Sequence, residues 1–438
     1  MCRHLIPKAA ALCCCTALLA SCGRAETSAA VRPDGNLDEC TLRFSWWGGD
    51  DRHEATLEAI ELWNELHPEI RIIPEYGGWD GWTEKINSQI SGGNAPDVMQ
   101  VNYDWLVTLS RDGTGFYDLG DLGNYLDLSG FDSETLSFGM INDRLNAVTV
   151  SMSGRGLFYN SQVYDRVGAE YPATWQELLS LGNTFSNYGC YPIDLDIQSG
   201  GTAWYLAVVY VQQQTGKTFI TMDGELGFDI SDIKMALDFY KSLEDNHVIR
   251  TVRQRSDEDG SSALYQSAEF IGGNVGGVFE WGSAIGKYEA VLDENVLECG
   301  PYLTDGNGNS SGWMIKPSFM YAISSSCAYP DEAAAFMNFL LNDSGCAEIL
   351  GTSRGIPASS YARDELEKSG HIDGLSKQST DMLLELDTIT VSPYMELSRM
   401  KDFYNTAIEQ ISYGNTDTET AASEMYESIK NYLEKLKS

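Results

Sequence analysis

Aromatic side chains gather just after the first three strands that the sequence predicts. The first of these strands ends in "FSWWGG" over 44–49, where Gly48 and Gly49 let the backbone approach a ligand that a side chain would hold away. Rigid aromatic rings give a large contact area at low entropic cost, and a few placed polar groups fix the orientation of a ligand. Such a set is typical of a small-molecule binding site. Its members are Trp47, Trp79, Trp82, Tyr103, Asp104 and Trp105.

The elements that must position these side chains alternate between strand and helix. Strands are predicted over 41–46, 69–75 and 96–102, with amphipathic helices between them, the first opening on the capping-box-like pair Asp51 and Glu54. This alternation predicts a parallel sheet with helices on its faces. Ligands of such sheets bind beyond the carboxyl ends of the strands. We therefore expect the aromatic residues to share one rim of an α/β fold.

Two long extended segments separate the α/β regions of the chain. One begins at Leu145 and leads to "PATWQEL", where Thr174 caps a helix that carries Glu177 in its first turn; the other covers 312–324. Two such crossings are the connectivity of a hinged, two-lobed protein that closes on its ligand. A chain of 438 residues also exceeds what one core usually organises. The predicted lobes are 38–152 with 320–370, and 153–319 with 371–438.

The first residues have the pattern of a secretory signal. Basic residues precede an apolar run over 9–20, which is too short to span a bilayer as a stable helix. The run ends in "LASC", which resembles the lipobox of bacterial lipoproteins and makes Cys22 the lipidated first residue of the mature chain. An ordinary signal with a chance cysteine is the alternative. We predict a signal peptide over 1–21 and a linker over 22–37.

Charge and cysteine content exclude several classes of protein. The net charge of −35 excludes nucleic acid as a partner. It does not exclude a small anionic ligand, because surface charges more than about 8 Å away are largely screened. The cysteines beyond Cys22 are odd in number, widely spaced and without a CxxC pair, so neither a disulfide framework nor a metal site is predicted. They are Cys40, Cys190, Cys299, Cys327 and Cys346.

The order of several motifs resembles the extracellular solute-binding proteins of bacterial carbohydrate ABC importers, of the maltose-binding-protein-like type. Within that family, the stretch over 43–82, with "VMQVNYDWL" and "GTGFYDL", is similar to the oligogalacturonide-binding proteins of pectin-degrading bacteria. The motifs run in order over nearly the whole chain. They are "FSWWGG", "SGGNAPDV", "GLFYN" before "PATWQEL", "VFEWGSA", "YAISSSCAYPDEAAAFMNFLL" and "SRGIPAS".

The resemblance implies a type II periplasmic-binding-protein fold with the ligand in the cleft between two lobes. It implies a monomeric, lipid-anchored receptor without a cofactor, on the outer face of the cell membrane or in the periplasm. This receptor would capture an oligosaccharide, an acidic one derived from pectin, and deliver it to an ABC permease.

Three alternatives to the acidic-sugar receptor stay open. The first is a receptor for a neutral oligosaccharide, and the second is a surface adhesin. The third, a glycosidase or lyase, needs a juxtaposed carboxylate pair or a base beside the sugar. We expect a receptor and not an enzyme.

A sugar site needs flat apolar platforms ringed by polar groups, because a pyranose presents C–H groups on its faces and hydroxyls at its edge. The resemblance supports Trp281 and Asp104 most strongly, while Trp63 and Trp175 lie in amphipathic helices and are expected in the core. Uronate carboxylates would need arginine partners, and Lys316 also falls near a predicted cleft edge. The predicted ligand-binding residues are Trp47, Asp50, Arg52, Trp79, Trp82, Tyr103, Asp104, Trp105, Arg155, Trp204, Trp281, Trp313 and Arg354.

Overall fold

The computed structural model describes residues 40–79, 81–195, 201–293, 296–306 and 310–437. The predicted signal peptide, Cys22 and the linker lie outside these residues. Among the helices described, none is long and apolar enough to cross a membrane.

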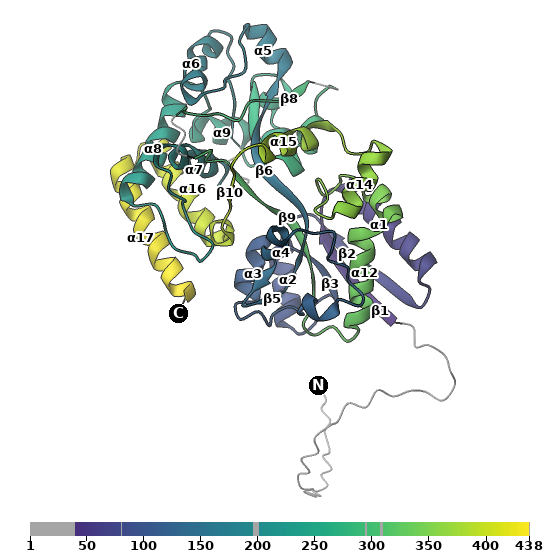
Figure 1. Ribbon diagram of the computed structural model, residues 1–438. Coiled ribbons are helices and arrows are strands. Elements are labelled where there is room, and N and C mark those ends of the chain that lie inside the picture. Colours follow the sequence, from purple (N-terminus) through teal and green to yellow (C-terminus); the bar gives the residue numbers. More distant parts are fainter. Residues whose placement is uncertain (1–39, 80, 196–200, 294–295, 307–309, 438) are drawn as a thin grey trace, which may run out of the picture. The chain divides into compact units, whose positions relative to one another are not determined.

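Three parallel strands open the fold, as the sequence predicts (Figure 1). β1 pairs with β2 from Cys40 opposite Ile70 onward, and with β3 at Phe44 opposite Val98. The predicted capping box of the first helix is wrong: the N-cap is Gly49, without a side-chain cap, because the helix already begins at Asp50. The elements are β1 (Cys40–Trp47), α1 (Asp50–Leu66), β2 (Ile70–Gly77), α2 (Trp82–Ser91), β3 (Val98–Val101), α3 (Tyr103–Leu109), η1 (Leu119–Leu122), α4 (Ser133–Ser137), β4 (Met140–Ile141) and β5 (Arg144–Leu145).

The two extended crossings form the longest strands, β6 (Val148–Asn160) and β9 (Met314–Ile323). They pair antiparallel, with register shifts over 149–152, and the sheet runs in the order β2-β1-β3-β9-β6-β7 (Figure 1). β8 also pairs with β6 and β10 with β9. At Gly154 of β6 a Cβ would lie 2.1 Å from Leu383 Cδ2, so a side chain has no room there.

The segment after β6 is mainly helical. The Thr174 and Glu177 capping box is confirmed at the start of α6, where the Glu177 N–H donates to Thr174 Oγ1 (3.2 Å). The elements that follow β6 are α5 (Ser161–Val167), α6 (Trp175–Ser186), α7 (Thr202–Thr215), α8 (Ile230–Asp245), α9 (Val252–Asp259), η2 (Leu264–Gln266), α10 (Ala268–Ile271), β7 (Gly277–Trp281), η3 (Gly282–Ala284), α11 (Gly286–Glu289) and β8 (Leu297–Cys299).

Helices also dominate the chain after β9. Pro330 occupies the first turn of α12, where its missing N–H leaves no hydrogen bond unmade. The elements are α12 (Pro330–Asn342), α13 (Ser344–Leu350), α14 (Ser360–Ser369), α15 (Gly374–Leu384), β10 (Ile389–Thr390), η4 (Pro393–Glu396), α16 (Ser398–Ser412) and α17 (Thr418–Lys437).

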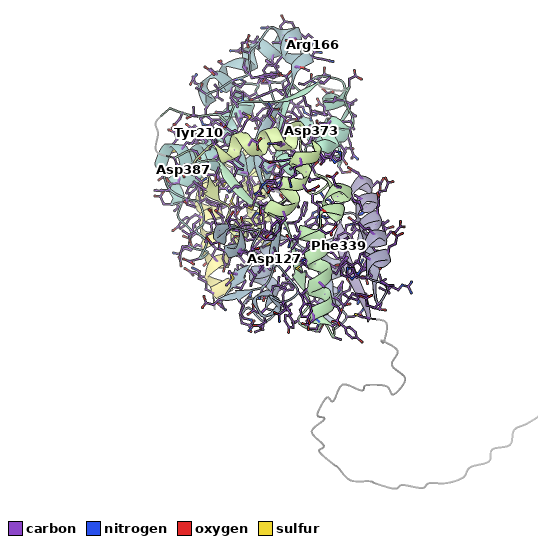
Figure 2. All side chains as sticks on the ribbon, turned by 45° about the vertical axis from the view of Figure 1, so that its right-hand side comes forward. Asp127, Arg166, Tyr210, Phe339, Asp373 and Asp387 are labelled. Atoms are coloured by element: carbon purple, nitrogen blue, oxygen red, sulfur yellow. The ribbon has the colours of Figure 1, made fainter. Side chains whose placement is uncertain are left out.

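Two large groups of buried side chains form the main cores. One gathers β1, α1 and α12, including Trp63 and Phe339; the other gathers α7, α8, α16 and α17 around Trp175. Figure 2 shows Phe339 on α12 and Tyr210 on α7 among the packed side chains. Trp63 and Trp175 are 1% and 4% exposed, so the prediction that both are core residues is confirmed. The exact lobe boundaries stay a prediction.

The five cysteines within the described residues are all free thiols. Cys40, Cys190 and Cys346 are buried, and Cys299 and Cys327 are half-buried. They pack as small apolar side chains.

Candidate functional site

A cleft of about 930 Å³ opens where the ends of β1, β3 and β7 meet the middle of β6 and β9. The amino end of α1, the segment before α15, η4 and α16 complete its wall. The carboxyl ends of parallel strands are the expected place for a ligand in such a sheet. The lining includes Trp47, Gly49, Asp51, Arg52, Trp79, Asn102, Ser153, Arg155, Trp281, Ser283, Lys287, Glu289, Lys316, Ser318, Phe319, Thr352, Ser353, Asp373, Glu396 and Lys401.

Aromatic rings form one wall of the cleft. Trp47 is 6% exposed and lies between Trp79, Trp105 and Phe319, with ring centroids 5.1, 5.5 and 5.6 Å away. Trp79 is 47% exposed. Trp79 therefore offers its ring to a ligand, while Trp47 supports it from behind.

Trp281 lies at the other side of the cleft, at the end of β7. The guanidinium of Arg155 and the ammonium of Lys316 each lie 4.6 Å from its ring centroid. Tyr205 packs edge-on against the same ring at 5.7 Å. Trp281 lines the cleft, where the sequence analysis places it. Its ring also contacts the cations of Arg155 and Lys316.

Several predicted platforms lie in the core instead. Trp204 is fully buried in α7 and stacks on Tyr404 at 5.4 Å, and Trp313 is 2% exposed and lies 6.2 Å from Trp175. Trp82 is 3% exposed and belongs to a buried apolar cluster with Trp47 and Met99. These three are corrected to core positions, because α7 is buried on nearly all sides, α2 turns its apolar face inward and Trp313 precedes a buried strand.

The residues predicted after β3 lie behind the cleft. Tyr103, Asp104 and Trp105 are 2%, 8% and 3% exposed and do not line it, whereas Asn102, one residue earlier, does. Asn102 Nδ2 donates to Asp104 Oδ1 at 2.5 Å. Asp50 is exposed at the start of α1 but outside the lining, where its neighbour Asp51 stands instead.

Arg52 reaches the cleft from the first turn of α1. Its Nε donates to the Ser353 carbonyl (3.0 Å) and its Nη1 to the Trp47 carbonyl (3.1 Å), and its guanidinium lies 4.4 Å from the Phe319 ring centroid. Within the described residues no carboxylate lies within 4 Å of it. Burial and the charge of Arg354 lower the pKa of Arg52 to about 9. Arg52 is thus a cation without an ion pair among the described residues, although the charge of Asp51 acts on it and partly offsets the lowering of its pKa.

Arg354 lies behind Arg52, 4% exposed and outside the lining. Its Nε donates to Gln100 Oε1 (3.2 Å) and its Nη2 to Thr56 Oγ1 (2.8 Å), while its buried Nη1 has no partner among the described residues. It therefore adds positive charge to the Arg52 end of the cleft without contacting the open space.

Three other cations of the cleft already have carboxylate partners. Arg155 Nη1 and Lys287 Nζ lie 3.7 and 2.9 Å from the carboxylate of Glu280, which is 2% exposed. Lys316 forms an ion pair with Glu396. Although burial opposes ionisation, Lys287 and Arg155 hold the pKa of Glu280 below its usual value. Lys316 and Glu396 therefore neutralise each other, whereas Arg155 and Lys287 share the single negative charge of Glu280.

Lys401 is the second cation of the cleft lining that has no carboxylate within 4 Å among the described residues. It projects from the first turns of α16, and its charge acts on two buried carboxyls. Although burial opposes ionisation, Lys316 and Lys401 hold the pKa of Glu396 at about 2. Burial raises the pKa of Asp104 to about 6, against the opposing pull of Lys401.

Cations therefore cluster in the cleft of an acidic chain, where a similar number of carboxylates, Glu280 included, lies among them. The cations of the lining are Arg52, Arg155, Lys287, Lys316 and Lys401, against the carboxylates of Asp51, Glu289, Asp373 and Glu396. Sequence reasoning missed Lys287, Phe319, Glu396 and Lys401. Lys287 follows the "FEWGSA" motif closely enough to have been found, whereas nothing local marks Lys401.

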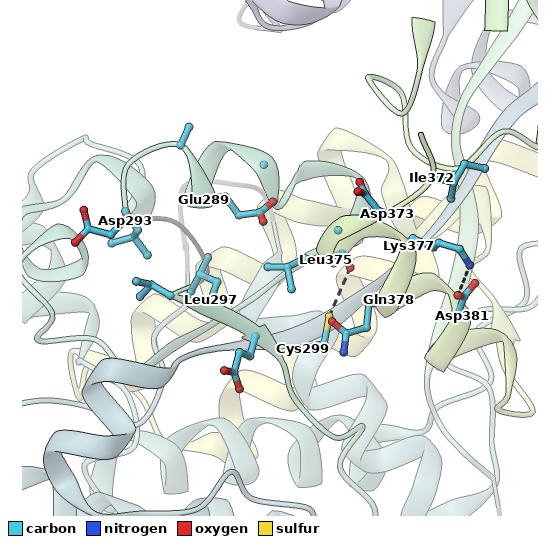
Figure 3. Close-up of a pocket in the computed structure, with 16 residues that line it drawn as sticks. Glu289, Asp293, Leu297, Cys299, Ile372, Asp373, Leu375, Lys377, Gln378 and Asp381 are labelled. Atoms are coloured by element: carbon cyan, nitrogen blue, oxygen red, sulfur yellow. Dashed lines mark hydrogen bonds and ion pairs between the residues drawn. The ribbon is translucent and has the colours of Figure 1, made fainter. Parts of the chain in front are cut away.

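A second groove, of about 1090 Å³, adjoins the cleft and is shown in Figure 3. It shares Glu289 and Asp373 with the cleft and adds Asp293, Glu298 and Asp381. Its one cation, Lys377, points toward Asp381 and pairs with it at 2.5 Å (Figure 3). The two hollows therefore differ in charge, and only the cleft suits an anion.

Comparisons with known proteins agree with this geometry. A periplasmic oligogalacturonide binding protein from Yersinia enterocolitica, solved with saturated digalacturonic acid, is 34% identical over 91% of this chain and 100% of its own, with a TM-score of 0.85. A periplasmic solute binding protein from Pectobacterium atrosepticum is 32% identical over 91% of this chain and 99% of its own, with a TM-score of 0.87. The predicted two-lobed type II α/β fold is confirmed by these likenesses.

Curated sequences match less of the chain. An uncharacterized lipoprotein from Streptomyces antibioticus is 25% identical over 69% of this chain and 66% of its own length. The chain spans about half the length, 46%, of other curated relatives that it matches. The model of the family named bacterial extracellular solute-binding protein matches residues 49–345, more than half of the chain. The chain belongs to the bacterial extracellular solute-binding protein family.

Proposed function

We propose that the protein is the substrate-binding component of an ABC importer and that its ligand is an acidic oligosaccharide, a pectin-derived oligogalacturonide. The observation that carries the acidic part is the collection of cations in the cleft of a chain whose net charge is −35. A carboxylate stripped of water needs a partner of opposite charge. A neutral sugar would leave Arg52 and Lys401 without one.

The aromatic wall supports a sugar as the class of ligand. The ring of Trp79, with Trp47 packed behind it, offers a flat apolar surface for the C–H groups of a pyranose, and Trp281 stands across the cleft. Ser153, Ser283 and Asn102 supply hydroxyl and amide groups for the sugar edge. The Yersinia relative, which was solved with a digalacturonic acid, adds support by likeness. The ligand-binding role of Trp47, Arg52, Trp79, Arg155 and Trp281 is part of this proposal.

The ligand would act by stabilising a closed arrangement of two lobes. We take the lobes to be 38–152 with 320–370, and 153–319 with 371–438, since the buried clusters divide in nearly this way. A ligand that contacts both lobes favours their closure by its contacts alone, without chemical change. Incubation with oligogalacturonides should therefore yield neither new reducing ends nor unsaturated products.

The proposal includes a lipid anchor on Cys22 and delivery of the ligand to a membrane permease. The "LASC" sequence and the likeness to the Streptomyces lipoprotein support the anchor. Replacing Cys22 by Ala should release the protein from the membrane fraction. Retention of the variant in that fraction would contradict the anchor.

Isothermal titration calorimetry tests the proposed ligand. We expect binding of di- and trigalacturonate, and weaker or absent binding of manno-, xylo- and malto-oligosaccharides of equal length. Preference for one of the neutral sugars would refute the acidic ligand and leave the receptor function standing.

A further inference from the structure

The cations of the cleft divide into two kinds by their partners. Arg155, Lys287 and Lys316 are paired with Glu280 or Glu396. Arg52 and Lys401 have no carboxylate within 4 Å among the residues described. An unpaired charge in a partly desolvated place is costly unless a ligand neutralises it. The unpaired cations therefore mark where negative charge of a ligand fits.

The Arg52 end of the cleft is built to hold an anion. Arg52 stands on the first turn of α1, whose N-cap Gly49 has no side-chain cap, and both residues line the cleft together with Asp51. Arg354 adds a second charge from behind, with an unpartnered buried Nη1. Its backbone neighbour Ser353 fixes the Arg52 guanidinium through a 3.0 Å hydrogen bond.

The Lys401 end belongs to a different part of the chain. Lys401 stands on α16, far from α1 in sequence, and its charge acts on Glu396 of η4 and on Lys316 of β9. Its neighbours Lys316 and Glu396 neutralise each other, and Asp104 faces it from α3 without forming an ion pair within 4 Å. Lys401 is thus the free positive charge of the α16 side.

We infer that the ligand carries at least two carboxylates and that Arg52 and Lys401 each hold a different one. The two cations lie on opposite predicted lobes, so a dicarboxylate links the lobes by charge, whereas a monocarboxylate neutralises only one end. Arg52 and Lys401 are then the residues that select two or more uronate units in a defined orientation. This inference rests on the proposed acidic ligand and assigns its two carboxylates to two residues.

The test combines two protein variants with two ligands. The ligands are the two singly methyl-esterified forms of digalacturonate, each with one carboxylate neutralised. The variants are Arg52→Gln and Lys401→Gln, with Arg52→Met and Lys401→Met as substitutes if a glutamine variant does not fold. Lys234→Gln is the matched control, because Lys234 pairs with Asp238 at 2.6 Å on α8, outside the cleft lining.

Wild-type protein should lose about 30-fold in affinity for each ester relative to digalacturonate, as expected for loss of a charge-assisted contact. Arg52→Gln should bind one of the two esters as tightly as it binds digalacturonate. Lys401→Gln should do the same with the other ester. The control variant should respond to both esters as the wild type does.

Two results overturn the inference. Either both variants become insensitive to the same ester, or each variant keeps the full loss with both esters. The proposed function fails separately: in that case wild-type protein binds digalacturonate no better than its fully esterified form, whatever the variants do.

Discussion

The unpaired charge of Arg52 predicts that its removal stabilises the ligand-free protein. Burial and Arg354 lower its pKa to about 9 from an ordinary value of 12.5. Since one pKa unit corresponds to about 1.4 kcal/mol, holding this charge costs up to about 5 kcal/mol. Arg52→Gln removes that cost but loses two hydrogen bonds to carbonyls, about 1–3 kcal/mol together, and a contact with Phe319 of about 0.5–1 kcal/mol.

The balance favours the variant by up to about 1–3.5 kcal/mol in free energy of unfolding, from the same principles. Arg155→Gln is the matched comparison within the same cleft. It leaves Glu280, 2% exposed, with Lys287 as its only cationic partner within 4 Å among the described residues, beside the Trp281 N–H that donates to Glu280 Oε1 at 2.8 Å. Breaking a buried pair costs about 3–5 kcal/mol, and the remaining lysine reduces this to about 1–3 kcal/mol. The two arginine variants should therefore change stability in opposite directions.

Differential scanning calorimetry of both variants without ligand, at pH 7.5 and low salt, measures this difference. We expect a transition temperature above that of the wild type for Arg52→Gln and below it for Arg155→Gln. Equal destabilisation by both changes would refute the reasoning, because it would mean that Arg52 is as well compensated in the free protein as Arg155.

Three further predictions concern Trp79 in the aromatic wall of the cleft, the buried Asp104, and Gly154 of β6. Trp79→Ala should weaken digalacturonate binding by about 1–2 kcal/mol in calorimetry with little change in transition temperature, since Trp79 is 47% exposed. In the folded protein the pKa of Asp104 is about 6, above the ordinary 3.8, so the carboxylate makes the wild type less stable as pH rises between these two values. Asp104→Asn should therefore stabilise the protein at pH 7.5 by up to about 3 kcal/mol and not at pH 4. Gly154→Ala should destabilise by about 2 kcal/mol or more in thermal unfolding, since its Cβ would lie 2.1 Å from Leu383 Cδ2, and Leu383→Ala in the same chain should recover part of the loss.

Each of these has a result that would contradict it. Unchanged affinity of Trp79→Ala would remove this ring from the site. A stabilisation by Asp104→Asn that is equal at pH 4 and pH 7.5 would show that Asp104 is not the titrating group. Full additivity of the Gly154 and Leu383 changes would show that the two side chains do not meet.

Local signals were enough to predict much of the fold. The alternation of strands and helices and the Thr174 capping box depend on short-range physics, and the structure has both. Strand ends also carry Trp47 and Trp281 to the cleft, because the carboxyl ends of neighbouring strands meet at one edge. The burial of Trp204 could have been predicted from the sequence, since its helix is apolar all round, which indicates a buried helix rather than a cleft wall.

The charges of the site were harder to predict. Arg155 lies within β6 and Arg354 in the loop between α13 and α14, yet only Arg155 lines the cleft. Lys401 comes from the helical tail, where ordinary solvated lysines are common, and only the tertiary packing of α16 against α7 and α8 brings it to the site. Long-range packing decides which cations form an ion pair with a carboxylate. The sequence alone therefore could not show that Arg52 and Lys401 have none within 4 Å among the described residues.

The central claim is that the cleft selects its ligand by negative charge. The most direct test is titration calorimetry of the wild-type protein with digalacturonate and with its fully methyl-esterified form, which has the same rings and linkage. We predict that the ester binds at least about 100-fold more weakly, since two charge-assisted contacts are lost. Equal affinities for the two ligands would contradict the claim.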